Sequence, residues 1–345
     1  MEPDFLSMTS GEWRSWMEQA GEKPFRGDIV FRHLHQRHAV SYDEMTDLGK
    51  ALREKLSKEC PLNYPRIETV QRAEDGTAKF LLRLYDGKAV ECVLMKYKFG
   101  YSLCISSQAG CRMGCRFCAS TLGGLERSLS AGEMAAEVYA VERSENLNIS
   151  HIVIMGCGEP FDNYDALLRF LELIHDEKGR NLSKRNITVS TCGLPNRIRQ
   201  FADEGTGVSL AISLHAPNDE IRKKIMRVAE GVPMEKLMDA VRYYQEKTSD
   251  RVTFEYILID GINDSDDNAR ELAERLKGML AHVNVIPVNP VEECGFARPS
   301  EARIRRFMAV LEEKGVNVTR RREMGKNIDA ACGQLRARAG KKLDH

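Results

Sequence analysis

Residues Cys111–Cys118, with the sequence CRMGCRFC, place three thiols within a stretch of eight residues. They follow the apolar run Leu103–Ser107 and precede a helical segment that begins near Ser130. Because thiolates are soft ligands, this spacing suits an iron–sulfur cluster, zinc or copper(I) held by one short loop. A structural zinc ion takes four ligands, whereas three thiolates on a cubane cluster leave one iron open for reaction. A zinc site completed by a distant Cys or His, and three buried cysteines without a metal, are the alternatives.

The composition of the chain bounds its class. Its 345 residues predict one large α/β unit with a small accessory unit, and its 42% hydrophobic and 30% charged content is ordinary for a soluble protein. No apolar run approaches the roughly 20 residues that span a bilayer, and the acidic N-terminus lacks the apolar segment of a signal peptide. We therefore expect a cytoplasmic protein without a membrane segment. The net charge of zero gives no indication of nucleic acid, while ten cysteines without a signal indicate metal or redox chemistry.

The chain changes character along its first hundred residues. Residues up to 62 carry apolar side chains at helical spacing and predict a small helical domain. Its predicted helices are Glu12–Gln19, Asp28–Arg37 and Tyr42–Lys58. Residues 63–98 contain short β-type runs separated by the turns Asp75-Gly76 and Asp86-Gly87. This pattern predicts a β-meander that joins two domains.

Beyond this meander, apolar strands alternate with helices. The predicted strands are Ser102–Ser106, His151–Met155, Ile187–Thr191, Gly207–Leu214, Val252–Ile259, Val283–Val288 and Val316–Arg321. Several of the helices between them begin with capping residues, namely Ser130, Ser265 and Ser300. The alternation predicts parallel βα units in a barrel, a partial barrel or a doubly wound sheet. In each of these folds, ligands bind at the carboxyl ends of the strands.

Most of the unusual residues fall at those strand ends. The cysteine triplet follows the first strand of the series. The other loops are GCGEP at Gly156–Pro160, STCG at Ser190–Gly193, SLHAP at Ser213–Pro217 and IPVNP at Ile286–Pro290. Each loop alone is a weak signal, since βα loops are generally rich in glycine and proline. Their expected convergence beside an open iron predicts one active site at this rim.

With these motifs in place, the chain resembles a known family. A CxxxCxxC motif after a strand, followed by a GEP loop in a βα series, resembles the radical S-adenosylmethionine (SAM) superfamily. Longer segments look like the radical SAM adenosine methyltransferases of RlmN type: SSQAGCRMGCRFCAS, GCGEPFDNY, LSKRNITVST, AISLHAPND, HVNVIPVNP and NIDAACGQL. The resemblance covers nearly the whole chain, because PFRGDIV and YDEMTDL in the helical domain also match.

The resemblance implies an α/β fold with a partial (β/α)6 barrel, a small N-terminal helical domain and a β-meander linker. It divides the chain into an RNA-contacting domain at residues 1–62, a linker at 63–98 and a radical SAM core at 99–345. The implied activity is methylation of the 2-position of adenine in 23S rRNA and in tRNA, next to the anticodon. The alternatives are the related antibiotic-resistance enzyme that methylates the 8-position, a non-catalytic RNA-binding metal protein, and a radical SAM enzyme with a small-molecule substrate. The motif CASTLGGLERSLS and the helical domain favour the 2-position enzymes.

The same resemblance assigns a cofactor site. Cys111, Cys115 and Cys118 would hold a [4Fe–4S] cluster, whose open iron would bind the amino and carboxylate groups of SAM. The other SAM contacts would come from Gly158, Glu159, Ser190, Ser213, Leu214, His215 and Asn289. Judged by itself, His215 is more simply explained as a buried core histidine. Where the family usually has GMGEP, this chain has Cys157, an extra thiol that we interpret as a neutral replacement.

Two further cysteines carry the implied mechanism, which uses two SAM molecules per turnover. Cys332 would take a methyl group from the first SAM by displacement. One-electron cleavage of the second would give a 5′-deoxyadenosyl radical, which removes hydrogen from the S-methyl group so that the carbon radical adds to adenine. Glu91 would accept the ring proton, and attack by Cys104 would release the product and leave a Cys104–Cys332 disulfide. From the residues alone, the two cysteines are equally well explained as buried apolar thiols, and Glu91 as an exposed carboxylate.

The implied partners are RNA and an electron donor. Candidate phosphate contacts are the basic residues Lys184, Arg185, Arg320, Arg321 and Arg322, together with the helical domain. A base that undergoes chemistry must leave its stack, so we expect the target adenosine to be extruded. The cluster would need a one-electron reductant such as flavodoxin, and we expect the protein to be a monomer.

Overall fold

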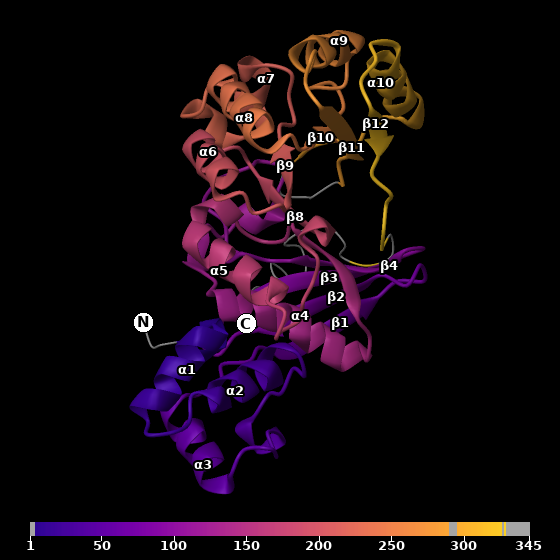
Figure 1. Cartoon of the computed structure of the whole chain (residues 1–345). Helices are drawn as coiled ribbons and strands as arrows, with labels where there is room; N and C mark the ends of the chain where they lie inside the picture. The colour runs from indigo at the N-terminus through magenta and orange to yellow at the C-terminus, as the bar shows by residue number, and fades with distance from the viewer. Residues whose placement is uncertain (1–3, 290–294, 326–327, 329–345) are drawn as a thin grey trace.

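A ten-stranded sheet in the order β1-β2-β3-β4-β7-β8-β9-β10-β11-β12 organises the protein. The computed structural model describes residues 4–289, 295–325 and 328, and the structural statements below concern these residues. Figure 1 shows three N-terminal helices at one end of the molecule, with the sheet and the remaining helices extending away from them. The sheet is antiparallel from β1 to β4 and parallel from β4 through β7 to β12.

The parallel part is an open βα series. Its strands are β4 (Gly100–Ile105), β7 (Ile149–Ile154), β8 (Ile187–Thr191), β9 (Ser209–Ser213), β10 (Val252–Leu258), β11 (Ala281–Pro287) and β12 (Val318–Arg320). Each lies within two residues of a strand predicted from the sequence. Within the described part of the chain β12 and β1 are the edges of the sheet, so the barrel does not close. This confirms the partial barrel, to which β12 adds one parallel strand beyond the sixth.

The connecting helices cover the outer face of the parallel strands (Figure 1). They are α4 (Ala131–Glu145), α5 (Tyr164–His175), α6 (Pro195–Glu204), α7 (Asp219–Ile225), α8 (Met234–Thr248), α9 (Asp266–Arg275) and α10 (Glu301–Glu313). The three predicted capping serines are confirmed, because Ser130, Ser265 and Ser300 each accept a hydrogen bond from a backbone N–H of the first turn. Side-chain oxygens at this position satisfy helix donors that otherwise have no partner.

The β-meander forms one continuous sheet with the barrel. It contains β1 (Arg66–Arg72), β2 (Ala78–Arg83) and β3 (Ala89–Tyr97). Strand β3 pairs antiparallel with β4, and Val93 lies opposite Cys104. The meander is therefore not a flexible connection between two bodies, because backbone hydrogen bonds hold it beside the first barrel strand.

The N-terminal helices are α1 (Ser10–Gln19), α2 (Phe25–His35) and α3 (Lys50–Glu59), with short 3-10 turns at Phe5–Ser7 and Tyr42–Glu44. The single helix predicted over Tyr42–Lys58 is wrong, because α3 begins only after Gly49. Thr46, Asp47 and Gly49 favour a turn. The helical spacing of apolar residues extends across this turn, because the residues on both sides of it are buried, namely Met45, Leu48, Leu52 and Leu56. The spacing alone therefore predicted one continuous helix.

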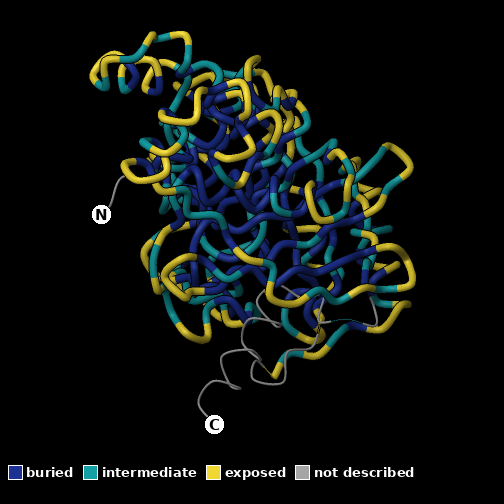
Figure 2. The backbone as a smooth tube through the Cα atoms, turned by 90° about the horizontal axis from the view of Figure 1, so that it is seen from below, coloured by how far each residue is buried: buried dark blue, intermediate teal, exposed yellow. Residues whose placement is uncertain are grey.

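The helical domain docks on α4 and α5 of the core. The backbone N–H of Gly132 in α4 donates to the Ser7 hydroxyl at 2.8 Å. Arg169 in α5 donates to Glu12 at 3.1 Å, and a ring nitrogen of His35 lies 3.0 Å from the Tyr139 hydroxyl. Figure 2 shows the buried segments running without interruption through the middle of the molecule. A single hydrophobic cluster includes residues from both parts, so they pack as one body.

A small hairpin that the sequence did not predict frames the cysteine loop. Strand β5 (Gln108–Gly110) pairs antiparallel with β6 (Leu125–Ser128), outside the main sheet. The CRMGCRFC segment lies between these two strands. The pairing of β5 with β6 thus holds the two ends of the cysteine loop close together, before α4 begins.

Candidate active site

A cavity of about 570 Å³ opens at the carboxyl ends of the parallel strands. Residues from all the loops singled out in the sequence line it. They are Cys111, Cys115, Cys118, Gly156, Gly158, Glu159, Ser190, Cys192, Ser213, His215 and Asn289. The volume is in the range of about 300–1,000 Å³ that is usual for small-molecule and cofactor sites. The structure thus brings together segments that are far apart in the sequence.

The cysteine loop is held in shape by backbone contacts. The backbone N–H of Cys111 donates to the carbonyl of Gly124 at 2.9 Å, which fixes the start of the loop to the β5–β6 hairpin. The Thr121 hydroxyl lies 3.1 Å from the carbonyl of Cys115 and 2.9 Å from that of Cys118. Cys115 also forms an isolated bridge with Met226, just after α7. These contacts fix the loop at its start, middle and end.

The three cysteines of the loop line one cavity. Among the described residues, no three His, Cys, Asp or Glu side chains lie close enough to share one metal ion. The ligands of one zinc ion all lie about 2.3 Å from it, whereas each thiolate of a cubane binds a different iron.

The GEP loop presents a buried carboxylate to this cavity. Gly158 has φ +103°, and a Cβ there would lie 2.6 Å from the Cβ of Gln108, so glycine is required. Glu159 accepts hydrogen bonds from the backbone N–H groups of Cys192, at 2.7 Å, and Phe161, at 3.0 Å. Burial raises the pKa of Glu159, although these amides oppose the shift. Within the described chain no cation pairs with it, so it fits the ammonium group of a ligand.

His215 faces the cavity with a defined tautomer. Its Nδ1 accepts the backbone N–H of Ile257 at 3.0 Å, so the proton of a neutral ring lies on Nε2. Burial, and then the charge of Arg222, lower its pKa to about 3. The ring of Phe117, from the cysteine loop, packs edge-on against it at 5.0 Å. His215 is therefore a neutral hydrogen-bond donor in the cavity wall, as well as a packed core residue.

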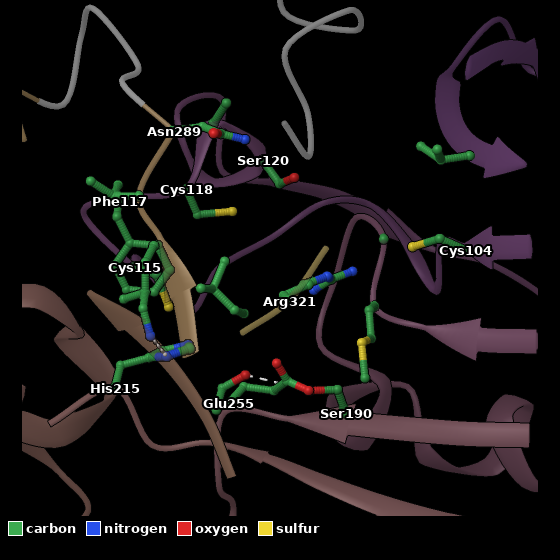
Figure 3. Close-up of a pocket in the computed structure, with 18 of the residues that line it drawn as sticks. Cys104, Cys115, Phe117, Cys118, Ser120, Ser190, His215, Glu255, Asn289 and Arg321 are labelled. Atoms are coloured by element: carbon green, nitrogen blue, oxygen red, sulfur yellow. Dashed lines mark hydrogen bonds between the residues drawn. The ribbon is translucent and has the colours of Figure 1, made fainter. Parts of the chain in front are cut away.

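The remaining predicted SAM contacts divide into two groups. The hydroxyls of Ser190 and Ser213 lie 3.4 Å apart on neighbouring strands, and Asn289 lines the cavity near the end of β11 (Figure 3). Leu214 differs, because its side chain belongs to the hydrophobic core and its carbonyl accepts from the Arg222 guanidinium. Its side chain is not among those that line the cavity.

Cys104 lines the same cavity from β4, across from the cluster cysteines (Figure 3). Glu91 lies on β3, on the same face as Val93, which is also in the cavity wall. It is buried, and its carboxylate lies 2.9 Å from the ammonium of Lys79. The exposed carboxylate considered from the sequence is therefore not found. Cys332 lies outside the described residues, so the Cys104–Cys332 disulfide stays a prediction.

Glu255, a charged residue of the cavity, was missed in the sequence, whereas Arg321 was predicted as a phosphate contact. Glu255 on β10 is buried and accepts from the Asn284 amide at 2.9 Å. Burial raises its pKa, while the charge of Arg321 opposes this shift. Both side chains line the cavity (Figure 3). The signal for Glu255 was a single carboxylate at an inward position of an otherwise apolar strand.

Arg222 in α7 is a second feature that the sequence did not reveal. Its side chain is 0% exposed, and it donates to the carbonyls of Cys192, at 2.6 Å, and Leu214, at 3.2 Å. It forms no ion pair with a carboxylate within the described residues, and its Nη1 has no hydrogen-bond partner there. The guanidinium thus ties the ends of β8 and β9 together beneath the cavity.

The basic residues proposed for RNA contact have different surroundings. Arg320 is engaged by two carboxylates, Glu301 and Glu323. Arg321 and Arg322 line the cavity instead. Lys184 begins a 3-10 turn before β8, at the opposite end of that strand from the cavity. Cys157 is buried and does not belong to the cavity lining, so its place gives no reason to expect an effect on SAM binding.

Comparisons with known proteins decide the family. Residues 105–273 match the model of the radical SAM superfamily, and residues 3–62 match that of the ribosomal RNA large subunit methyltransferase N-terminal domain. The chain is 49% identical over 342 residues to the probable dual-specificity RNA methyltransferase RlmN of Geobacillus kaustophilus. That match covers 98% of this chain and 94% of the relative. The chain belongs to the RlmN family.

One further relative and one solved structure also match this RlmN-family chain over nearly its whole length. The probable dual-specificity RNA methyltransferase RlmN of Lachnoclostridium phytofermentans is 50% identical, over 96% of this chain and 94% of its own. The crystal structure of a radical SAM methyltransferase from Sphaerobacter thermophilus superposes with a TM-score of 0.93 at 44% identity, covering 97% and 99% of the two chains. These matches confirm the resemblance to RlmN-type enzymes and the α/β fold with its N-terminal helical domain. Among the described residues of this RlmN-family chain, no helix has the length and apolarity to cross a membrane.

Proposed function

We propose that this RlmN-family protein is a radical SAM methyltransferase that methylates the 2-position of adenine in 23S rRNA and in tRNA. The observation that carries the proposal is that the cysteines of the CxxxCxxC loop and Cys104 line one cavity. A purely structural metal site would have no use for a separate thiol across an open space. The full-length similarity to relatives named as dual-specificity RNA methyltransferases supports RNA as the substrate.

The cavity residues fit the cofactors of the radical SAM superfamily, a [4Fe–4S] cluster and SAM. Cys111, Cys115 and Cys118 would hold the cluster, and Glu159 would accept from the ammonium of SAM. When bound, the cluster would supply the electron that cleaves SAM to a 5′-deoxyadenosyl radical. The remaining contacts would come from polar groups that line the cavity, namely Gly158, Ser190, Ser213, His215 and Asn289. The neutral His215 offers its Nε2–H as a donor without adding charge.

The chain's own nucleophiles would carry the methyl group. Cys332 would take it from one SAM as a thiolate and hold it as S-methylcysteine. Cys104 would later attack Cys332 to release the methylated base, which leaves a disulfide between them. Glu91 would accept the proton from the adenine ring. Glu91 is buried, and its carboxylate lies 2.9 Å from the Lys79 ammonium.

Several finer parts of the proposal concern partners and organisation. Residues 1–62 would contact RNA, residues 63–98 would place Glu91, and residues 99–345 would form the catalytic core. A one-electron reductant such as flavodoxin, a monomeric state and a cytoplasmic location complete it. The close docking of the helical domain on α4 and α5 supports a fixed RNA-binding surface.

Nucleoside analysis tests the proposed function. Anaerobically reconstituted protein, SAM, dithionite and either tRNA or a 23S rRNA fragment should yield 2-methyladenosine by mass spectrometry. Appearance of 8-methyladenosine alone would reassign the enzyme to the 8-position type. If no 5′-deoxyadenosine forms in the presence of a bound cluster, the protein is not a radical SAM enzyme.

A further inference from the structure

The two-residue turn between β3 and β4 exposes a flat aromatic surface. Tyr97 pairs with Gly100 across this turn, and the Phe99 side chain between them is 61% exposed. The rings of Tyr97 and Phe99 are stacked, with centroids 4.9 Å apart and an interplanar angle of 7°. His151 of β7 packs edge-on against Phe99 at 4.7 Å. Phe99 is therefore held from below and from the side, with its outer face open.

This surface continues the cavity wall along β3. Val93 and Met95 line the cavity, and alternate residues of a strand share one face. Tyr97 lies on that same face, because its hydroxyl donates to the Met95 sulfur at 3.7 Å. A row of side chains thus runs from the reaction cavity to the exposed Phe99.

Two lysines are adjacent in sequence to the aromatic pair, because Lys96 precedes Tyr97 and Lys98 lies between Tyr97 and Phe99. Lys96 and Lys98 are exposed, and neither forms an ion pair within the described residues. The nearest acidic turn, between β1 and β2, holds Asp75, whose carboxylate accepts the backbone N–H groups of Thr77 and Gly325. Two exposed lysines next to an exposed aromatic pair form a cationic and aromatic surface. It suits a polyanion with aromatic groups.

We propose that Phe99, supported by Tyr97 and located in the turn that also carries Lys98, stacks an unpaired base of the RNA substrate beside the target adenosine. The inference rests on the proposed function and adds a contact outside both the SAM site and the helical domain. An extruded adenosine leaves its neighbours without a stacking partner, and aromatic side chains provide one in proteins that bind single-stranded RNA. The lysines would neutralise the adjacent phosphates.

Binding of a fluorescein-labelled RNA hairpin with an unpaired adenosine in its loop tests the proposal. The cluster-loaded full chain is used throughout. Phe99→Ala should weaken RNA binding about tenfold, because loss of one base–aromatic stack has roughly this effect. Phe99→Trp should restore it. The Lys96→Gln/Lys98→Gln double variant should reduce the slope of log K against log salt by about 1.4, as two phosphate contacts to a single strand predict.

Tyr85 provides a matched control. It is an exposed aromatic side chain at 56%, in the turn at the other end of β2 and β3. Tyr85→Ala should bind RNA like the wild type. Reductive cleavage of SAM without RNA should be unchanged in every variant, which shows that the cavity is intact.

The outcomes separate this proposal from the proposed function. If the wild type methylates RNA and Phe99→Ala binds it normally, the stacking contact is refuted and the enzymatic function stands. Loss of binding that Phe99→Trp does not restore also overturns it, because any flat ring should stack. If the wild type forms 5′-deoxyadenosine but neither binds nor methylates RNA, both proposals fail together.

Discussion

The Lys79 ammonium lies 2.9 Å from the Glu91 carboxylate, and both side chains are buried within the antiparallel part of the sheet. Removing one partner of such a pair leaves the other charge in an apolar setting. We expect Lys79→Met to lower the free energy of unfolding by about 3–5 kcal/mol. Urea unfolding followed by circular dichroism measures this change.

The exposed pair of Lys88 and Glu126, 3.2 Å apart, provides the control for this prediction. Lys88→Met should cost less than about 1 kcal/mol, since solvent screens exposed pairs. Equal effects of Lys79→Met and Lys88→Met would show that burial of the first pair has no energetic consequence.

The two cysteine roles predict opposite products. Cys332→Ala should leave the protein without any methyl label from radioactive SAM, because the acceptor thiol is gone. Cys104→Ala should instead accumulate a covalent protein–RNA species, visible as a shifted band on a denaturing gel. Cys92→Ala is the matched control, because Cys92 is buried like Cys104 but lies on the neighbouring strand β3 and packs in the hydrophobic core rather than lining the cavity. Normal turnover by Cys104→Ala would end the proposed resolving role.

The close crossing of α1 and α2 predicts that a substitution at Gly27 destabilises the helical domain. A Cβ on Gly27 would lie 2.5 Å from the backbone of Arg14 and Trp13, closer than real contacts. Gly27→Ala should therefore push the helices apart and cost about 1–3 kcal/mol. Both tryptophans of the chain, Trp13 and Trp16, belong to α1, so tryptophan fluorescence reports this domain alone.

For this variant we expect a lower temperature of the fluorescence transition and weaker RNA binding, with SAM cleavage retained. Gly49→Ala serves for comparison, because nothing lies within 4 Å of a Cβ at that position. If Gly27→Ala and Gly49→Ala melt alike, the helix crossing is more tolerant than the distances indicate.

His35 predicts acid sensitivity where the helical domain meets α4. Burial, and then the charge of His38, lower the pKa of His35 to about 3 from an ordinary value near 6.5. Burial lowers the pKa of the neighbouring His38 as well. The Glu142 carboxylate raises that pKa, and the charges of Arg180 and Arg143 lower it. Between pH 6.5 and pH 3 the unfolded chain binds one more proton at His35 than the folded chain, so stability falls as the pH decreases through this range.

The size of this stability change follows from the pH interval over which His35 is protonated in the unfolded chain but not in the folded chain. Between pH 6.5 and pH 5, His35 alone should lower the free energy of unfolding by about 2 kcal/mol. His35→Phe keeps the ring packing and cannot take up a proton, so its stability should decrease less on acidification. Urea unfolding of both proteins at pH 7 and pH 5 provides the comparison. The same decrease in both would assign the acid sensitivity to other groups.

The regular part of the fold was predictable because its signals are periodic. The strand Ile187–Thr191 was predicted without error, since it is a short β-branched run with a turn on each side. The β5–β6 hairpin was missed because β5 has only three residues, too few for any alternation. The break before α3 was missed because burial of Leu48 and Leu52 continues the helical spacing through a turn.

The site was predictable where its residues form motifs. The cysteine triplet and the GEP loop are contiguous, so sequence alone placed them. Glu255 on β10 and Arg222 in α7 come from separate elements, and each is an ordinary charged residue in its local sequence. Only the folded chain shows that Glu255 lines the cavity and that Arg222 ties together two of the strands that end there. In the same way, burial of Glu91 depends on Lys79, twelve residues earlier on the neighbouring strand, which no local pattern reveals.

The pairing of Val93 with Cys104 sets a parity rule for the β3–β4 hairpin. Glu91 shares a face with Val93 because they are two positions apart on the strand, and Cys104 lies across from Val93 on that face. Deleting or adding one residue between Val93 and Glu91 would turn the carboxylate to the helix side of the sheet. An insertion of two residues at this point would keep the carboxylate on the same face of the sheet but would move it by one full repeat along β3. Length changes in this short segment are therefore expected to be excluded among active enzymes, even where its sequence varies.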